Sequence, residues 1–185
     1  MHLIGLLGRS RSGKDTVAHI LLDALKPTNY RLRHISKPLK DALKSMYGYD
    51  DSHVFGKMKD VRDLRYDKTP RDLCHEWNQK LASMHGPDFL VRRTFDDYDA
   101  HVQIGEQVPH WIIPDVRYPH DCDAIQARGG IIWKITRADL PFKLSHEDHI
   151  DRLDGDACIQ NSADINALRE SVLRILNQTR KTHPT

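Results

Sequence analysis

The sequence lacks the features of a secreted, membrane-spanning or strongly DNA-binding protein. Its 185 residues include only three cysteines, Cys74, Cys122 and Cys158, so no disulfide framework is expected and a reducing cytoplasm is the natural location. No apolar run approaches the ~20 residues that cross a bilayer, and the short run Leu3–Leu7 lacks the charged lead of a signal peptide. The net charge of +2 is too small to favour nucleic acid as a partner.

What the sequence contains is an alternation of short apolar runs and helical patterns. Strands are expected at 3–7, 31–35, 111–113, 131–136 and 157–160, and helices at 14–25, 38–46, 70–84, 88–98, 121–128 and 164–176. Pro114 should end the third strand, and Thr69 should cap a helix that begins at Pro70. This order predicts an α/β fold with a mostly parallel sheet of about five strands and helices on both faces. We expect one domain over residues 1–177 and a flexible tail over 178–185.

The segment GRSRSGKDT follows the first expected strand and begins the first expected helix. In such a loop, backbone N–H groups and the helix N-terminus bind phosphate oxygens, and the lysine reaches the outer phosphates. An ordinary turn with a helix cap would not require glycines at both ends. The sequence therefore predicts a P-loop whose phosphate-binding residues are Gly8, Arg9, Ser10, Arg11, Ser12, Gly13, Lys14, Asp15 and Thr16.

Asp15 stands where the usual pattern has a metal-binding serine or threonine. One interpretation is an acid in the first helical turn, which the helix dipole favours by roughly 0.3–1 kcal/mol. The other is a carboxylate that faces Mg²⁺, directly or through water, with the Thr16 hydroxyl as a second oxygen ligand. A carboxylate beside phosphates would repel them unless a cation lay between, and this favours the second interpretation.

Several segments resemble, in order, the deoxynucleoside monophosphate kinases of tailed phages: GRSRSGKDT, SKPLKDAL, TPRDL, PDVRYPHDCDAIQARGG and DACIQNSADINAL. The likeness spans residues 1 to about 176 and is thin between 47 and 68. It implies a P-loop kinase in the host cytoplasm that uses ATP and Mg²⁺ to phosphorylate a dNMP, with Asn161 beside the adenine. The segment SHEDH departs from the H-x-[ST]-E pattern of the family, which leaves the roles of His146 and Glu147 open.

Phosphoryl transfer requires two anionic substrates held in line and cations on the transferring group. Arg117 follows the third expected strand, where similar kinases hold the acceptor phosphate. Asp115 would orient Arg117, bind the substrate or hold a metal-bound water; a purely structural Asp–Arg pair is the alternative. Lys37 and Arg71 are further candidates for acceptor binding, although both also fit exposed positions in a first helical turn.

Residues 138–155 have little apolar periodicity and fit a lid that excludes water and carries cations to the transferring phosphate. Arg137, directly before this segment, and Arg152, within it, are the candidates for these cations. The expected catalytic residues are then Lys14, Asp15, Arg117 and Arg137.

Two other functions fit the sequence. Animal phosphomevalonate kinases carry a similar G-K-D loop, so the acceptor is either a dNMP or another small phosphate ester, such as phosphomevalonate or dephospho-coenzyme A. A non-kinase ATP-binding regulator is the second alternative, and it would require no second anion site. Small molecules are the expected partners, with no nucleic acid or membrane, and a homodimer is left open. No residue specifies the base or the absence of a 2′-hydroxyl.

Overall fold

A computed structural model describes residues 2–104, 108–140, 145–162 and 164–182, apart from the side chains of Pro27, Ser145 and His146. The structure has two compact units, Met1–His34 with Tyr98–Thr185, and Ile35–Asp97. Each unit has its own cluster of buried apolar side chains.

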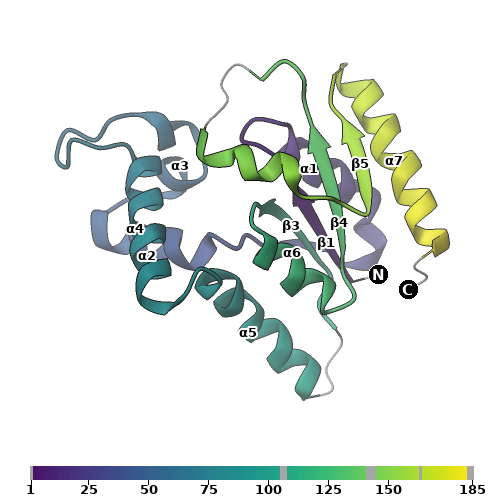
Figure 1. Ribbon diagram of the computed structural model, residues 1–185, viewed down its shortest axis with the longest axis horizontal. Coiled ribbons are helices and arrows are strands. Elements are labelled where there is room, and N and C mark those ends of the chain that lie inside the picture. The colour runs from purple at the N-terminus through teal and green to yellow at the C-terminus, as the bar shows by residue number, and fades with distance from the viewer. Residues whose placement is uncertain (1, 105–107, 141–144, 163, 183–185) are drawn as a thin grey trace. The chain divides into compact units, whose positions relative to one another are not determined.

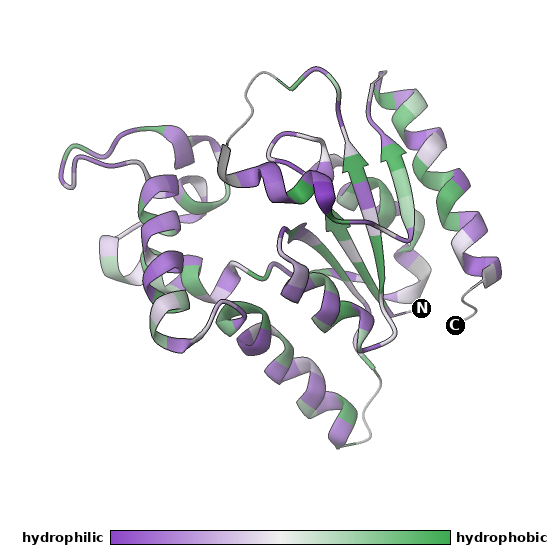
Figure 2. Cartoon of the chain, viewed as in Figure 1, coloured by the Kyte–Doolittle hydropathy of each residue, from purple (hydrophilic) through white to green (hydrophobic). Residues whose placement is uncertain are grey.

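The first unit is built on a parallel sheet of five strands (Figure 1). The strands lie in the order β2 (Arg31–Leu32), β3 (Trp111–Val116), β1 (Leu3–Leu7), β4 (Ile131–Thr136) and β5 (Ala157–Gln160). Every residue of the central strand β1 is buried, and Figure 2 shows the apolar character of the strands. The predicted parallel α/β fold is therefore confirmed.

Helices cover both faces of this sheet. On one face, Leu6 and Trp133 pack with side chains of α1 (Lys14–Ala24) and α7 (Ile165–Thr182). On the other, a Cβ built on Gly5 would lie 2.8 Å from Ile125 of α6 (Pro119–Gln126). Since consecutive residues of a strand point to opposite faces, Gly5 and Leu6 mark the two layers, as the sequence predicted.

Strand β3 runs through Pro114 to Val116, so the prediction that it ends at Pro114 is wrong. The register with β1 shifts there: Gly5 pairs with Ile113, whereas Leu7 pairs with Val116. A proline is tolerated at such an irregularity, because the ladder does not require its missing N–H. The strand consequently ends directly before Arg117.

The second unit contains α2 (Lys37–Tyr47), α3 (Asp51–Val54), the 3₁₀ helix η2 (Lys57–Asp60), α4 (Pro70–His85) and the beginning of α5 (Phe89–Gln103). Its core includes Tyr49, Val54 and Leu73. The Thr69 hydroxyl accepts from the Asp72 N–H at 3.1 Å, and the Asp72 carboxylate accepts from the Thr69 N–H at 3.2 Å. The predicted cap before Pro70 is confirmed.

Two short 3₁₀ helices complete the first unit, η1 (Lys26–Thr28) and η3 (Ser145–Arg152). Helix α7 extends to Thr182 and so includes residues 178–182 of the expected tail. In the part of the chain that the structure describes, no helix is both long and apolar enough to cross a membrane.

Candidate active site

The loop between β1 and α1 requires glycine at both ends because other groups approach it closely. A Cβ at Gly8 would collide with the carbonyl oxygen of Ile135 in β4. Gly13 has a φ of 102°, and a Cβ there would collide with the Asn161 side-chain amide. That amide donates to the Ser12 carbonyl oxygen at 2.9 Å. The glycine spacing that predicted a P-loop is thus required by the packing of the loop against β4 and the end of β5.

The Lys14 side chain lies folded along this loop. Its ammonium donates to the carbonyl oxygens of Gly8 and Arg9, both at 2.6 Å, and the residue is 8% exposed. Burial lowers the pKa of Lys14 to about 8; the positive charge of Arg117 adds to the lowering. A polyphosphate at the loop would favour the charged form again, because opposite charges stabilise each other.

Four other charged groups share the surroundings of Lys14. Besides Arg117, the carboxylates of Glu147, Asp15 and Asp115 act on it, and each raises its pKa. Arg117 lies in the loop after β3 and Glu147 in η3, whereas Asp15 lies at the start of α1 and Asp115 in β3. The structure therefore brings together four expected site residues, Lys14, Asp15, Asp115 and Arg117. It places beside them Glu147, whose role the sequence left open.

Arg117 is held at both its backbone and its side chain. The buried Asp121 carboxylate accepts from the N–H groups of Arg117 and Tyr118, each at 3.0 Å, and burial raises the pKa of Asp121. The guanidinium Nη1 donates to Glu147 Oε1 at 2.9 Å, and 34% of the Arg117 side chain is exposed. This arginine is thus partly open to a ligand while its orientation is fixed.

Asp15 and Thr16 are exposed in the first turn of α1. Mg²⁺ prefers oxygen ligands and retains several waters, so a carboxylate and a hydroxyl beside a bound polyphosphate fit this ion. No cluster of three His, Cys, Asp or Glu side chains that could hold a metal exists among the described residues.

The 3₁₀ helix η3 brings acidic side chains to the P-loop. Arg9 donates to Asp148 Oδ1 and to Asp151 Oδ2, both at 2.8 Å, and Glu147 Oε2 accepts from the Ser10 N–H at 3.0 Å. The sequence expected cations from residues 138–155, yet Arg152 is exposed and carboxylates make these contacts. Residues 141–144 and the His146 side chain lie outside the described part.

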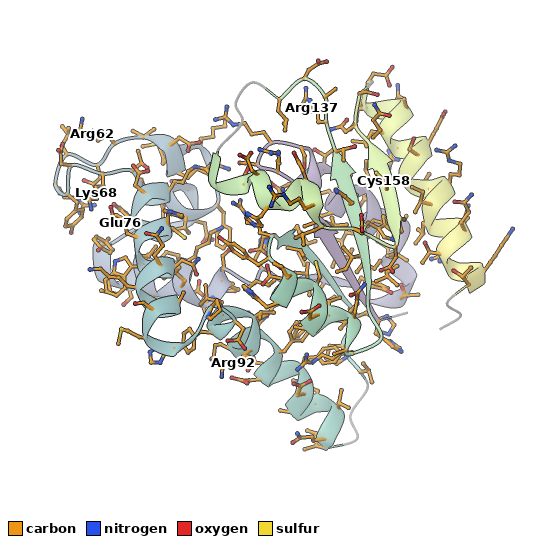
Figure 3. All side chains as sticks on the ribbon, in the orientation of Figure 1. Arg62, Lys68, Glu76, Arg92, Arg137 and Cys158 are labelled. Atoms are coloured by element: carbon orange, nitrogen blue, oxygen red, sulfur yellow. The ribbon has the colours of Figure 1, made fainter. Side chains whose placement is uncertain are left out.

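Arg137 lines a cavity of about 160 Å³ beside the P-loop, together with Gly8, Ser12 and Thr136. It is exposed on the segment that leaves β4 (Figure 3). The buried Ser12 Oγ and Arg9 Nη1 have no hydrogen-bond partner within the described part of the chain. Because buried polar atoms are normally paired, a water or a polar ligand group fits this cavity.

Asp115 lies near the end of β3, and its Oδ2 is 3.8 Å from His34 Nδ1. Lys37 and Arg71 belong to the second unit, where Lys37 pairs with Asp41 and Arg71 with Asp60. Their expected role toward the acceptor stays a prediction.

The sequence left the role of Glu147 open, and it did not single out Asp148, Asp151 or Asp121 as parts of this site. The partners of Glu147, Asp148 and Asp151 are up to 142 residues away along the chain, and no spacing connects such residues. The partners of Asp121 are only three and four positions away, but its burial is not visible in the sequence. The acid-rich segment SHEDHID is a weak signal, because acidic runs on exposed helices are common.

Comparisons with known proteins agree with a kinase. No protein-family model matches the chain. A protein of Acanthamoeba polyphaga mimivirus, provisionally named a deoxynucleotide monophosphate kinase, is 27% identical over 161 residues, 82% of each chain.

Two solved structures are more distantly similar. Dephospho-CoA kinase from Campylobacter jejuni is 14% identical with a TM-score of 0.49, covering 97% of this chain and 98% of that one. Shikimate kinase from Aquifex aeolicus is 15% identical with a TM-score of 0.47, covering 96% of this chain and 97% of that one. Likenesses at this level carry no information about the acceptor. The P-loop, the parallel α/β fold and the viral relative together support a kinase.

Proposed function

We propose that the chain is a deoxynucleoside monophosphate kinase, which transfers the γ-phosphate of ATP to a dNMP and releases ADP and a dNDP. The observation that carries the proposal is that two cations lie at the P-loop: the Lys14 ammonium donates to loop carbonyl oxygens, and Glu147 joins the Arg117 guanidinium to the Ser10 N–H of the same loop. A loop that only binds a nucleotide needs the first of these cations. A second, partly exposed arginine is what an acceptor phosphate requires. The name of the viral relative supports the dNMP as that acceptor.

The donor side of the reaction is assigned to the P-loop, residues 8–16. Its N–H groups and Lys14 would hold the ATP phosphates, and Asp15 and Thr16 would hold Mg²⁺. Bound Mg²⁺ neutralises charge that develops on the phosphates. Lys14 would stabilise the γ-phosphoryl group as it leaves ADP. Asn161, which braces Ser12, is assigned to the adenine end of the donor.

The acceptor side is assigned to Arg117 and Asp115. A guanidinium holds a phosphate through two parallel hydrogen bonds, which fixes both its distance and its orientation. In-line transfer depends on this orientation, because there is little covalent chemistry for the protein to perform. Arg137 would stabilise the phosphoryl group during transfer, and the segment 138–155 would exclude water. Lys37 and Arg71 are kept as proposed dNMP-binding residues.

A substrate panel tests the proposal. ADP formation would be measured with ATP and Mg²⁺ in the presence of each of the four dNMPs, the four NMPs, phosphomevalonate or dephospho-coenzyme A. We expect at least one dNMP to give the highest kcat/KM. A clear preference for either non-nucleotide ester would remove the dNMP assignment and leave the P-loop kinase in place. ATP consumption that no acceptor accelerates would favour a regulator.

A further inference from the structure

Glu147 is a buried carboxylate that contacts both sides of the proposed site. Only 2% of the residue is exposed. Its Oε2 accepts from the Ser10 N–H of the P-loop at 3.0 Å, and its Oε1 accepts from Arg117 Nη1 at 2.9 Å. The two oxygens therefore connect the donor loop to the arginine assigned to the acceptor.

The contact leaves Arg117 able to bind a second anion. A guanidinium has five N–H donors, and the bond to Glu147 engages one terminal nitrogen, Nη1. About a third of the side chain, 34%, is exposed. A buried carboxylate is costly unless it is paired, so Glu147 stabilises one orientation of this arginine.

The rest of η3 holds Glu147 in position. Arg9 pairs with Asp148 and Asp151 on the same short helix. His149 Nε2 lies 3.0 Å from the Arg117 carbonyl oxygen, and the His149 ring stacks on Tyr118 at a centroid distance of 5.0 Å. Glu147 is thus fixed by its neighbours before any substrate binds, as precise positioning demands.

We infer that Glu147 is a positioning residue: it fixes the Arg117 guanidinium at a set distance from the P-loop backbone, and through Arg117 it places the acceptor phosphate in line with the γ-phosphate. The inference rests on the proposed function. It also changes the expected contribution of residues 138–155 from cations alone to a carboxylate that orients a cation. Glu147 itself need not touch either substrate.

Two other roles of Glu147 predict different results when the residue is substituted. A residue that only stabilises the fold would lower the melting temperature on substitution and leave the kinetics of the folded fraction unchanged. A carboxylate that competes with phosphate for the P-loop N–H groups would, once removed, strengthen ATP binding. A positioning residue instead affects kcat/KM for the acceptor and leaves ATP affinity nearly unchanged.

The experiment compares Glu147→Ala, Glu147→Gln, Arg117→Lys and the double variant Arg117→Lys with Glu147→Ala. Glu170→Gln, at an exposed carboxylate on α7, is the matched control. For each variant, kcat/KM for the best acceptor, ATP affinity by calorimetry and the melting temperature are measured. We expect Glu147→Ala to lower kcat/KM about tenfold to a hundredfold, and Glu147→Gln, which retains an oxygen acceptor, to lose less. Glu170→Gln should resemble the wild type.

The double variant provides the deciding result. If Glu147 acts through Arg117, the loss in the double variant is smaller than the product of the single losses. Multiplicative losses, unchanged kinetics in folded Glu147→Ala, or tighter ATP binding would each overturn the inference. If Glu147→Ala does not fold, Glu147→Gln carries the same comparison.

Failure of the proposed function is visible in the wild type alone. A wild-type protein that phosphorylates no acceptor overturns both proposals. One that prefers another phosphate ester overturns the dNMP assignment, and the variants are then compared with that ester.

Discussion

The P-loop and the helix η3 lie against each other, yet they are specified in different ways. Lys14 bonds to carbonyl groups only five and six positions away, and the two glycines are visible as a motif. Glu147 bonds to Ser10 across 137 positions and to Arg117 across 30. The P-loop is thus formed by neighbouring residues and is visible as a sequence motif. The acidic side of the site forms only when folding brings β3, β4 and η3 together.

The largest effect is expected from a substitution in the P-loop, the part of the site that the sequence specifies locally. Lys14→Ala should lower kcat by about 10²–10³-fold or more, because it removes a preorganised cation from the developing charge. The fold should persist, because the two hydrogen bonds that the ammonium donates lie within the loop itself. Steady-state kinetics with circular dichroism as the folding control measures both. Lys14→Met, which keeps the buried stem, should be as inactive; near-normal activity in either variant would remove the P-loop assignment.

The second largest effect is expected from a substitution of Arg117, which belongs to the part of the site that distant segments form. Arg117→Lys should lower kcat/KM for the dNMP by about tenfold to a few hundredfold, because lysine cannot form two parallel hydrogen bonds to a phosphate and each such bond contributes roughly 1.5–3 kcal/mol. ATP affinity, measured by calorimetry on the same variant, should hardly change. If ATP affinity collapses while the acceptor kinetics hold, Arg117 belongs to the donor side.

A third prediction separates the stability lost through backbone conformation from the stability lost through a tertiary contact. Gly13 and Gly129 both have positive φ, 102° and 71°, but only Gly13 has a neighbour, the Asn161 amide, in the space of a Cβ. Gly129→Ala should cost roughly 1–2 kcal/mol of unfolding free energy through backbone conformation alone. Gly13→Ala should cost about 1–3 kcal/mol more. Urea unfolding measures both, and equal losses would mean that Asn161 moves aside freely.

The smallest expected effect concerns Asp15. If this carboxylate faces Mg²⁺, Asp15→Asn should raise the Mg²⁺ concentration for half-maximal rate about threefold to tenfold, with a smaller change in KM for the dNMP. The rate is measured over a Mg²⁺ titration at saturating ATP. An unshifted titration with a slight loss of stability would decide for a helix-dipole acid.

Much of the fold followed from the sequence because its signals are local. The five strands and the helix cap at Thr69 were predicted from apolar runs and from the Thr-Pro pair. Two strand ends differ from the prediction. The second strand ends at Leu32 and not at residue 35, and Pro114 indicated a strand end although the irregular register with β1 accommodates it. Compatibility with a proline depends on a neighbouring strand, and that neighbour is more than 100 positions away in the sequence.

Some residues of the site were predictable from the sequence, and others were not. Lys14 and Asp15 were selected from their positions in the P-loop motif, and Arg117 from its position after the third expected strand, where similar kinases hold the acceptor phosphate. Asp121 was not selected, although its carboxylate holds the backbone of Arg117 and Tyr118. Whether an acid is solvated or buried against N–H groups depends on what packs over it, and that information is not contained in spacing.

The sequence by itself determined the phosphate loop, because two glycines, a lysine and a following helix are consecutive and their chemistry is local. It also determined the parallel α/β architecture, because apolar runs of strand length alternate with helical patterns. Only the tertiary structure decided that η3 places Glu147 between Ser10 and Arg117. The physical reason is that a buried carboxylate is stable only where folding brings donors to it from distant parts of the chain.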